Sequence, residues 1–302
     1  MIYKIIQKRK IFLSLSTLAV AASIFALIFW GLNFGIDFTG GSLLEVEYKN
    51  YQPTITEVQD SLQSVDLHNL VIQPTENSLI VRFKENTEEA HQIAVQKLQS
   101  LIKDKKDASF KELQFDAVGP SVGQELKNKS FNATVIVFIM IIIYISVAFR
   151  KVSKPVASWK YGVAAIIALV HDILFILGVF SVLGHFYGVE INTPFIAAIL
   201  TVLGYSVSDT IIVFDRIREN LPKSQEDFEN TINRSVNQTL TRSINTSFSA
   251  ILALLAVLFF GGATIKDFAL ALIVGIFVGT YSSIFIASPA LVVWDGLIRR
   301  RK

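Results

Sequence analysis

Asp209 lies within an apolar stretch, residues 193–214, that has the length and composition of a transmembrane helix. A charged side chain near the bilayer centre costs at least about 2.5–3.5 kcal/mol, so such a carboxylate normally faces a cavity or a partner and carries a function. The helical rotation of 100° per residue places Thr201, Tyr205 and Ser208 in the same arc as Asp209. The pattern therefore predicts a polar stripe that leads to a proton-binding acid.

The next apolar helix offers a cation for this acid. Arg242 shares one helical face with Asn245, Thr246 and Ser249. Arginine stays charged whereas aspartate titrates, so a proton arriving at Asp209 would weaken a pairing with Arg242 and release that contact. One alternative stays open: a static ion pair that braces two helices, with Arg242 at the membrane interface, where arginine side chains snorkel.

His171 and Asp172 are a second candidate, in the middle of the apolar residues 161–183. Both side chains can carry a proton, and neither is cheap to bury. Adjacent residues of a helix point about 100° apart, so the two do not belong to one narrow stripe. A proton relay and a structural hydrogen bond to a neighbouring helix are equally compatible with this pattern.

Small residues mark two places where helices can pack closely. Gly204 and Ser208, four residues apart, allow another backbone to approach the helix that carries Asp209. The last apolar stretch has a longer ridge of small side chains at four-residue intervals: Ala271, Gly275, Gly279, Ser283 and Ala287. This ridge predicts a packing seam, and Pro289 beyond it predicts a bend.

Six apolar stretches are long enough to cross the ~30 Å hydrocarbon core of a bilayer: residues 11–31, 131–149, 161–183, 193–214, 245–260 and 268–294. The 302 residues are 52% hydrophobic, with a mean hydropathy of +0.49, which indicates a polytopic α-helical membrane protein. The fifth stretch is short, so its helix is expected to begin before Asn245. Residues 224–240 predict a short helix on the membrane surface or on a cytoplasmic partner.

Basic residues concentrate in three clusters without acids, as is typical of cytoplasmic segments. They are Lys4, Lys8, Arg9 and Lys10; then Arg150, Lys151, Lys154 and Lys160; and finally Arg299, Arg300, Arg301 and Lys302. Both termini are therefore predicted to be cytoplasmic. A retained first helix is favoured over a cleaved signal peptide, because residues 30–34 replace the expected small-residue cleavage site. The net charge of +3 follows from this topology and gives no indication of nucleic-acid binding.

The residues between the first two apolar stretches have the periodicity of a soluble domain. Alternation predicts strands at residues 42–48, 70–73, 79–83 and 111–118, with helices that begin at the caps Thr54 and Thr87. The order βαββαβ predicts a ferredoxin-like α+β domain outside the cytoplasm. The predicted divisions are residues 1–34, with the first membrane helix, 35–129, the external domain, and 130–302, with helices two to six.

The external domain has no pattern of a catalytic site. The chain lacks cysteine, which leaves neither disulfides nor thiolate chemistry, and no metal-ligand spacing occurs. Residues 37–129 contain fifteen acids and ten bases, scattered along solvated faces. Binding of a substrate or partner is therefore the favoured role of this domain, with a passive spacer as the alternative.

Two segments resemble the signature motifs of the SecF proteins, protein-export membrane proteins of the SecD/SecF family. Residues 34–41 read FGIDFTGG, directly after the first apolar stretch, and residues 204–220 read GYSVSDTIIVFDRIREN. The resemblance covers the whole chain, including the pair His171 and Asp172. One departure is visible, because the family usually has asparagine where this chain has Ser208.

The resemblance implies an accessory subunit of the Sec translocase in the bacterial inner membrane. Members act with SecD, a sister subunit, and with the SecYEG channel and other small membrane subunits, and they use the proton-motive force to promote late steps of preprotein export. Asp209 matches the family's proton-linked aspartate, and Arg242 lies near the position of its functional arginine. No enzymatic activity, metal or organic cofactor is implied, and a carboxylate serves sodium as well as a proton.

The first motif contains Gly35, Asp37, Gly40 and Gly41. Two flexible glycines between the first helix and the first strand are expected to act as a hinge that transmits movement. The family belongs to the resistance-nodulation-division superfamily, in which two six-helix repeats face each other. This chain has one repeat, so a second polypeptide is expected to supply the other. Such a partner would also account for the small-residue ridge of the last helix.

Two other functions compete with protein export. A small-molecule efflux pump of the same superfamily is disfavoured, because it would carry two repeats and a second large external loop. A passive membrane scaffold without ion coupling remains the other alternative. The chain has no Gly-x-x-x-x-Gly-Lys-Ser/Thr motif, so any ATP would be used elsewhere.

Overall fold

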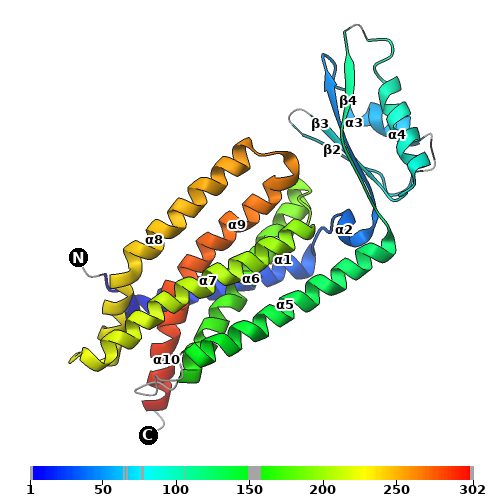
Figure 1. The fold of residues 1–302 in the computed structure, drawn as a ribbon. Coiled ribbons are helices and arrows are strands. Elements are labelled where there is room, and N and C mark those ends of the chain that lie inside the picture. Colours follow the sequence, from blue (N-terminus) through cyan, green and yellow to red (C-terminus); the bar gives the residue numbers. More distant parts are fainter. Residues whose placement is uncertain are drawn as a thin grey trace. The chain divides into compact units, whose positions relative to one another are not determined.

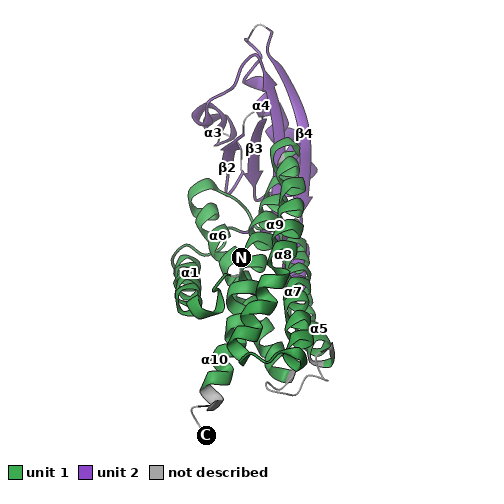
Figure 2. Cartoon of the chain, turned by 90° about the vertical axis from the view of Figure 1, so that its left-hand side faces the viewer, with its two compact units in different colours: residues 1–33, 132–302 green, residues 34–131 purple. Residues whose placement is uncertain are grey.

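The structure, a computed structural model, describes residues 3–63, 65, 67–75, 78–105, 107–148 and 158–299. The chain divides into two compact units, one of residues 1–33 with 132–302 and one of residues 34–131 (Figure 2). Parts of the predicted basic clusters, Arg150, Lys151 and Lys154 and residues 300–302, lie outside the described residues, as do residues 76 and 77 of the turn between the second and third predicted strands.

Unit 1 contains the helices of membrane-spanning length (Figure 1). They are α1 (Arg9–Phe29), α5 (Pro120–Ala148), α6 (Ser158–Tyr187), α7 (Thr193–Asn220), α8 (Phe228–Phe260) and α9 (Ala263–Ser282), the last continued by α10 (Ser288–Arg299). The first turns of α5 belong to unit 2. In the part of the chain that the structure describes, six helices are long and apolar enough to cross a membrane, which confirms the predicted polytopic fold.

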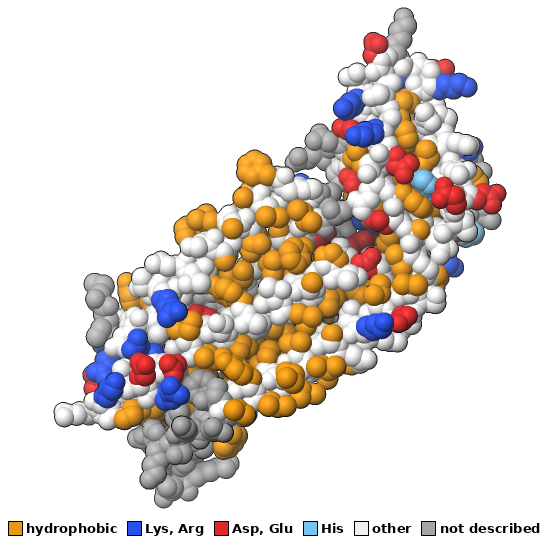
Figure 3. Space-filling view, viewed as in Figure 1, with side chains coloured by type: hydrophobic (Ala, Val, Ile, Leu, Met, Phe, Trp, Pro, Cys, Tyr) orange, Lys and Arg blue, Asp and Glu red, His pale blue; other side chains and the backbone are white. Residues whose placement is uncertain are grey.

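Helices α6, α7 and the span of α9 with α10 form the inner layer of unit 1. At least half of each apolar segment is buried in these three spans, compared with 11% in α8. The outer helices turn apolar side chains outward, as helices in contact with lipid do (Figure 3). Charged side chains gather where α7 turns into α8, with ion pairs between Arg216 and Glu219 and between Arg218 and Asp215.

An asparagine clamp, formed by Asn233 and Asn237 of α8, holds the segment before α1. The Oδ1 atom of Asn233 accepts hydrogen bonds from the backbone N–H groups of Ile5, at 3.0 Å, and of Ile6, at 3.1 Å. Asn237 Oδ1 accepts from the N–H of Tyr3 at 2.7 Å, and both amide groups donate to the Tyr3 carbonyl. The start of the short 3-10 helix η1 (Ile6–Lys8) is thereby fixed on the first turns of α8.

The prediction of a separate surface helix at residues 224–240 is wrong. Helix α8 runs without a break from Phe228 to Phe260, and Asp227 caps it by accepting from the N–H of Asn230 at 2.8 Å. Ile232 and Val236, which suggested a membrane-facing stripe, are fully buried inside unit 1. The same helix confirms that the fifth span begins before Asn245.

The last span changes helix type in its middle. Helix α9 ends at Ser282, Ser283–Ala287 form a π-helical turn (η3), and α10 begins at Ser288. The Ser288 hydroxyl donates to the Ser283 carbonyl at 3.1 Å, while Pro289 has no N–H to contribute to the helical ladder. The irregularity expected at Pro289 thus lies one turn earlier, as a π turn of the kind often found at functional sites.

Unit 2 is a four-stranded antiparallel sheet with two helices on one face. Its elements are β1 (Gly41–Lys49), α3 (Ile55–Gln63), β2 (Val71–Pro74), β3 (Ser78–Phe83), α4 (Glu88–Ser100) and β4 (Ser109–Val118), after the short turn α2 (Ile36–Thr39). The strand order is β2-β3-β1-β4, and the chain order is the predicted βαββαβ. Leu44, Val81, Val58 and Leu98 lie in the core between the sheet and the helices.

The predicted helix caps of unit 2 are present. Glu57 accepts from the backbone N–H of Thr54 at 2.8 Å, and the Thr54 hydroxyl accepts from the N–H of Glu57 at 3.3 Å. This reciprocal capping box starts α3 where the sequence places it. The Thr87 hydroxyl accepts from the N–H of Ala90 and starts α4.

Candidate functional site

Asp209 is buried in unit 1, and a hydrogen bond is formed by one of its two carboxylate oxygens in the described part of the chain. Its side chain lies on α7 and is 8% exposed. Atom Oδ1 accepts a hydrogen bond of 2.5 Å from the Ser243 hydroxyl of α8. Atom Oδ2 is buried and makes no hydrogen bond within 3.5 Å in the described part of the chain, although the carboxylate also interacts with the Ser283 hydroxyl of η3. A buried carboxylate with one free oxygen is able to take up a proton without first breaking an existing bond.

Arg242 is not paired with Asp209 in this conformation. Its side chain is exposed, and no ion pair within 4.0 Å joins it to the acid among the described residues. The guanidinium still interacts electrostatically with the Asp209 carboxylate. Because neighbouring residues of a helix point 100° apart, the hydroxyl of Ser243 takes the position facing Asp209 and Arg242 points outward. The structure therefore adds Ser243 to the site, a residue that the sequence analysis missed.

Most of the other polar residues predicted around Asp209 face away from the rest of the chain. Tyr205 is half-buried, and its hydroxyl lies 2.9 Å from the Ser247 hydroxyl of α8. The outward polar residues of α7 and α8 are Thr201, Gly204, Ser208, Arg242, Asn245, Thr246 and Ser249, all exposed. A Cβ atom added at Gly204 would meet nothing within 4 Å. These helices thus present polar and small side chains on surfaces that this chain leaves uncovered.

Asp172 is the most deeply buried acid of unit 1, with no exposed surface. Its Oδ2 atom accepts from the hydroxyl of Ser206 on α7 at 2.6 Å and from that of Ser282 on α9 at 2.8 Å. Its Oδ1 atom lies 3.1 Å from Nδ1 of His171. The side chain therefore connects α6, α7 and α9. This is the structural role that was one of the two alternatives for this residue, the other being a proton relay.

The small-residue ridge of the last span packs on α7 of the same chain. A Cβ atom at Gly275 would lie 2.2 Å from the Val202 side chain, and one at Gly279 would lie 3.0 Å from that of Ser206. One turn further, the hydroxyls of Ser283 and Thr210 are 2.9 Å apart. The expectation that a second polypeptide covers this ridge is wrong, because α7 presents its own residues at the matching four-residue spacing.

Further hydroxyl groups lie along the helix seams. Ser247 lies 2.5 Å from Thr280 of α9, so Tyr205, Ser247 and Thr280 form one chain of hydroxyls. Ser282 and Ser283, which contact Asp172 and Thr210, stand where α9 gives way to the π turn. The two buried acids therefore lie on one hydrogen-bonded helix core.

The first motif is part of unit 2, where it forms a tightly packed junction. Gly35 precedes α2, whose first turn contains Asp37, and Gly40 and Gly41 have positive φ angles of 74° and 119°. A Cβ atom at Gly40 would lie 2.9 Å from the Cα atom of Pro120, and one at Gly41 would lie 2.7 Å from the Phe83 carbonyl oxygen. These glycines are required for close approach of the chain segments that enter and leave the domain. Their role as a hinge stays a prediction.

No group of three or more histidine, cysteine or acidic side chains that would hold a metal ion occurs in the described ranges. The candidate site is therefore an arrangement of carboxylates, hydroxyls and one arginine. Such groups bind protons and small hard cations.

Comparison with known proteins gives matches over nearly the whole chain. Residues 97–296 match the model of the C-terminal region of the protein-export membrane proteins SecD and SecF, and residues 25–51 match the SecD/SecF GG motif. The SecF translocase subunit of Thermobaculum terrenum is 42% identical over 96% of this chain and 93% of its own length. That of Anaerolinea thermophila is 39% identical over 96% and 94%, respectively.

Two solved structures share the fold. The crystal structure of SecDF from Thermus thermophilus, a translocon-associated membrane protein, superposes with a TM-score of 0.83 at 33% identity. The superposed region covers 98% of this chain and 39% of the SecDF chain. A second SecDF structure, in a super-membrane-facing form, gives a TM-score of 0.70 at 32% identity, over 40% of its length. This chain thus spans about two fifths of the solved SecDF chains.

Proposed function

Because the chain belongs to the SecF branch of the SecD/SecF family of protein-export membrane proteins, we propose that it is an accessory subunit of the Sec preprotein translocase. It works with SecD and uses the proton-motive force to promote late stages of export through SecYEG. The observation that supports the proton coupling is Asp209, which is buried with one oxygen bound by Ser243 and the other without a hydrogen bond within 3.5 Å among the described residues.

The proposed cycle alternates two states of Asp209. In the protonated state the neutral acid keeps its bond to Ser243, as in the conformation described, while Arg242 points outward. Loss of the proton leaves a buried carboxylate, which attracts the nearby guanidinium and favours a shift of α8 against α7. One charge that crosses 100 mV supplies about 2.3 kcal/mol, which changes a conformational equilibrium by well over tenfold.

Asp172 and His171 have a supporting role in this proposal. Asp172 holds three helices together through Ser206 and Ser282, so that α7 carries Asp209 on a fixed core. A relay through this pair is the alternative. Sodium instead of a proton is a second alternative for the coupling ion, because carboxylates bind both.

SecD is the proposed partner for the outward polar residues of α7 and α8. Exposed polar groups in membrane-spanning helices are expensive against lipid and normally face protein or water. The solved relatives are SecDF chains more than twice as long as the matched region, which supports a second half in the assembly. The proposal places both termini in the cytoplasm of a bacterium, with the six spans in the inner membrane. Other small membrane subunits are further proposed partners.

Replacement of Asp209 tests the coupling. In inner-membrane vesicles with SecYEG and SecD, Asp209→Asn should abolish the part of preprotein export that depends on the proton gradient. Arg242→Gln should cause the same loss, and the double variant should be no worse than either single variant, because residues of one relay are not additive. Ser208→Asn, which introduces the usual family residue beside Asp209, is the matched control and should retain export.

The opposite result would identify a passive scaffold. If Asp209→Asn exports at the wild-type rate under a proton gradient, the coupling is wrong. Additive losses of export from Asp209→Asn and Arg242→Gln would show that the two residues do not act in one relay. Replacement of a proton gradient by a sodium gradient in the same vesicles identifies the ion.

A further inference from the structure

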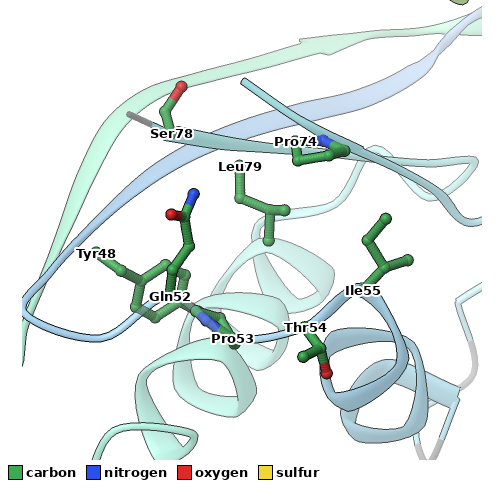
Figure 4. A pocket seen from close by; sticks show the side chains of 8 residues that line it. All are labelled: Tyr48, Gln52, Pro53, Thr54, Ile55, Pro74, Ser78 and Leu79. Carbon is green, nitrogen blue, oxygen red and sulfur yellow. The ribbon is translucent and has the colours of Figure 1, made fainter. Parts of the chain in front are cut away.

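Unit 2 contains a pocket at one end of its sheet that plays no part in the proton site. The pocket has a volume of about 330 Å³ and lies between the sheet and the loop that enters α3 (Figure 4). It is lined by Tyr48, Gln52, Pro53, Thr54, Ile55, Pro74, Ser78 and Leu79. Aromatic, aliphatic and proline side chains supply most of the lining, so the pocket suits an apolar group.

The walls of the pocket are fixed before any ligand arrives. The Tyr48 hydroxyl donates to the Leu98 carbonyl at 3.0 Å, which orients its ring, and burial raises the pKa of Tyr48 above its ordinary value. The capping box of Thr54 and Glu57 holds the loop that enters α3. Leu79 belongs to the hydrophobic core of unit 2. A preformed apolar pocket of this kind binds without the entropic cost of ordering its walls.

The mouth of the pocket exposes an apolar residue next to an edge strand of the sheet. Ile55 is 47% exposed although it is large and aliphatic. Strand β2, which contributes Pro74, is at the edge of the sheet and pairs only with β3 in the described residues. An extended peptide beside such an edge bonds through its backbone and points alternate side chains to one face, so one of them can enter a neighbouring pocket.

We propose that this pocket binds a large apolar side chain of the translocating preprotein while the preprotein is in an extended state. The inference rests on the proposed role in export and names the surface of this chain that contacts the substrate. Glu57, beside Thr54, has a pKa held below its ordinary value by the Thr54 backbone and hydroxyl and by Tyr51. It therefore remains charged beside the capped start of α3, next to Lys105, whose ammonium lies 4.6 Å from the centre of the Tyr51 ring.

Site-specific crosslinking in the complete complex tests this proposal. A photoactivatable phenylalanine analogue is placed at Ile55, or at Leu113 of β4 as the matched control, because their exposed fractions are 47% and 44%. The probe is a preprotein stalled by a folded C-terminal domain, with a phenylalanine in the segment that has crossed the membrane. We expect the adduct with preprotein from Ile55 to exceed that from Leu113 by about tenfold, and to fall when the phenylalanine is replaced by serine, because burial of one such side chain favours binding by about this factor or more.

A charge at the mouth provides a second measurement. Ile55→Glu adds an acid to the first turn of α3, which the helix dipole tolerates, but it places a carboxylate against the apolar pocket. We expect it to slow export of the phenylalanine-containing preprotein several-fold, whereas Leu113→Glu should leave the rate unchanged.

The outcomes separate this proposal from the proton coupling. Equal adducts from Ile55 and Leu113, or an Ile55 adduct with SecD whether or not preprotein is present, would overturn the pocket assignment. If Asp209→Asn still abolishes proton-driven export in the same vesicles, the coupling stands without the pocket. A preprotein adduct specific to Ile55, together with normal export by Asp209→Asn, would leave the pocket in place and remove the coupling.

Discussion

The two acids of unit 1 differ in how completely their oxygens are satisfied. Among the described residues, Asp172 has bonds to two serine hydroxyls and a contact with His171, whereas Asp209 has one serine bond within 3.5 Å, at Oδ1, and a buried Oδ2 without one. Buried polar groups normally have partners, so an acid with an unsatisfied oxygen is a candidate to bind a proton, an ion or a water molecule. Asp172 therefore connects the helices of the core, and Asp209 is the acid that we propose to exchange the proton.

Substitution of Asp172 distinguishes these roles. Asn at this position keeps an oxygen that accepts from Ser206 and Ser282, so Asp172→Asn should retain both thermal stability in detergent and proton-driven export. Asp172→Leu should lower stability, because each buried hydroxyl left without an acceptor costs about 1–3 kcal/mol. If Asp172→Asn is stable but inactive in export, the residue is a relay.

At the scale of helices, the seam between α7 and α9 decides how the Asp209 helix is held. Glycines of α9 receive the side chains of Val202 and Ser206, and the hydroxyls of Thr210 and Ser283 continue the row. Close approach of small residues is what holds helices together in lipid, where no hydrophobic effect favours their association.

A methyl group in this seam should be destabilising. Gly275→Ala places a Cβ atom 2.2 Å from the Val202 side chain. Such overpacking typically costs about 1–3 kcal/mol, so the thermal midpoint in detergent should fall. Gly204→Ala is the matched control on α7, because its Cβ atom would meet nothing within 4 Å of this chain. The double variant Gly275→Ala with Val202→Ala should recover stability, and a midpoint equal to wild type for Gly275→Ala alone would contradict the observed packing.

At the scale of the whole molecule, the described part of the chain has six helices of membrane-spanning length, and α7 and α8 expose polar side chains that the chain leaves uncovered. If SecD covers these surfaces, a large side chain at Gly204 should weaken the association with SecD without lowering the stability of the isolated subunit. Gly204→Leu is expected to keep the thermal midpoint of the isolated subunit but to reduce co-purification with SecD. Ile28→Phe on the outer face of α1, where Ile28 is 74% exposed, serves as the control. Unchanged co-purification of Gly204→Leu would place the partner elsewhere.

Sequence patterns were sufficient for features that depend on local repetition. Runs of apolar residues gave the six spans, and alternation with caps such as Thr54 and Thr87 gave the elements of unit 2. The strand order follows from the βαββαβ succession. These features depend on residues close together in the chain, which is why periodicity reveals them.

Contacts between helices were predicted less well, because they depend on helix rotation. The predicted partner of Asp209 was Arg242, whereas the side chain that forms the hydrogen bond belongs to the next residue, Ser243. Ser243 and Ser247 on α8 have the four-residue spacing of small side chains that was noticed on the last helix, so the same rule would have found them. The pairing of the α9 ridge with α7 required both helices to be in place, and the π turn at Ser283 has no sequence signal beyond Pro289.

The asparagine clamp has a consequence for how the protein is made. Tyr3 and Asn237 are separated by 234 positions in the chain, so the ribosome completes the anchored segment long before its anchor. Because synthesis proceeds from the N-terminus, α1 must enter the membrane and stay there while the tail before it has nothing to bind. The contact between this tail and α8 forms only after α8 has left the ribosome. It is therefore a late step of biogenesis and a marker of a finished subunit.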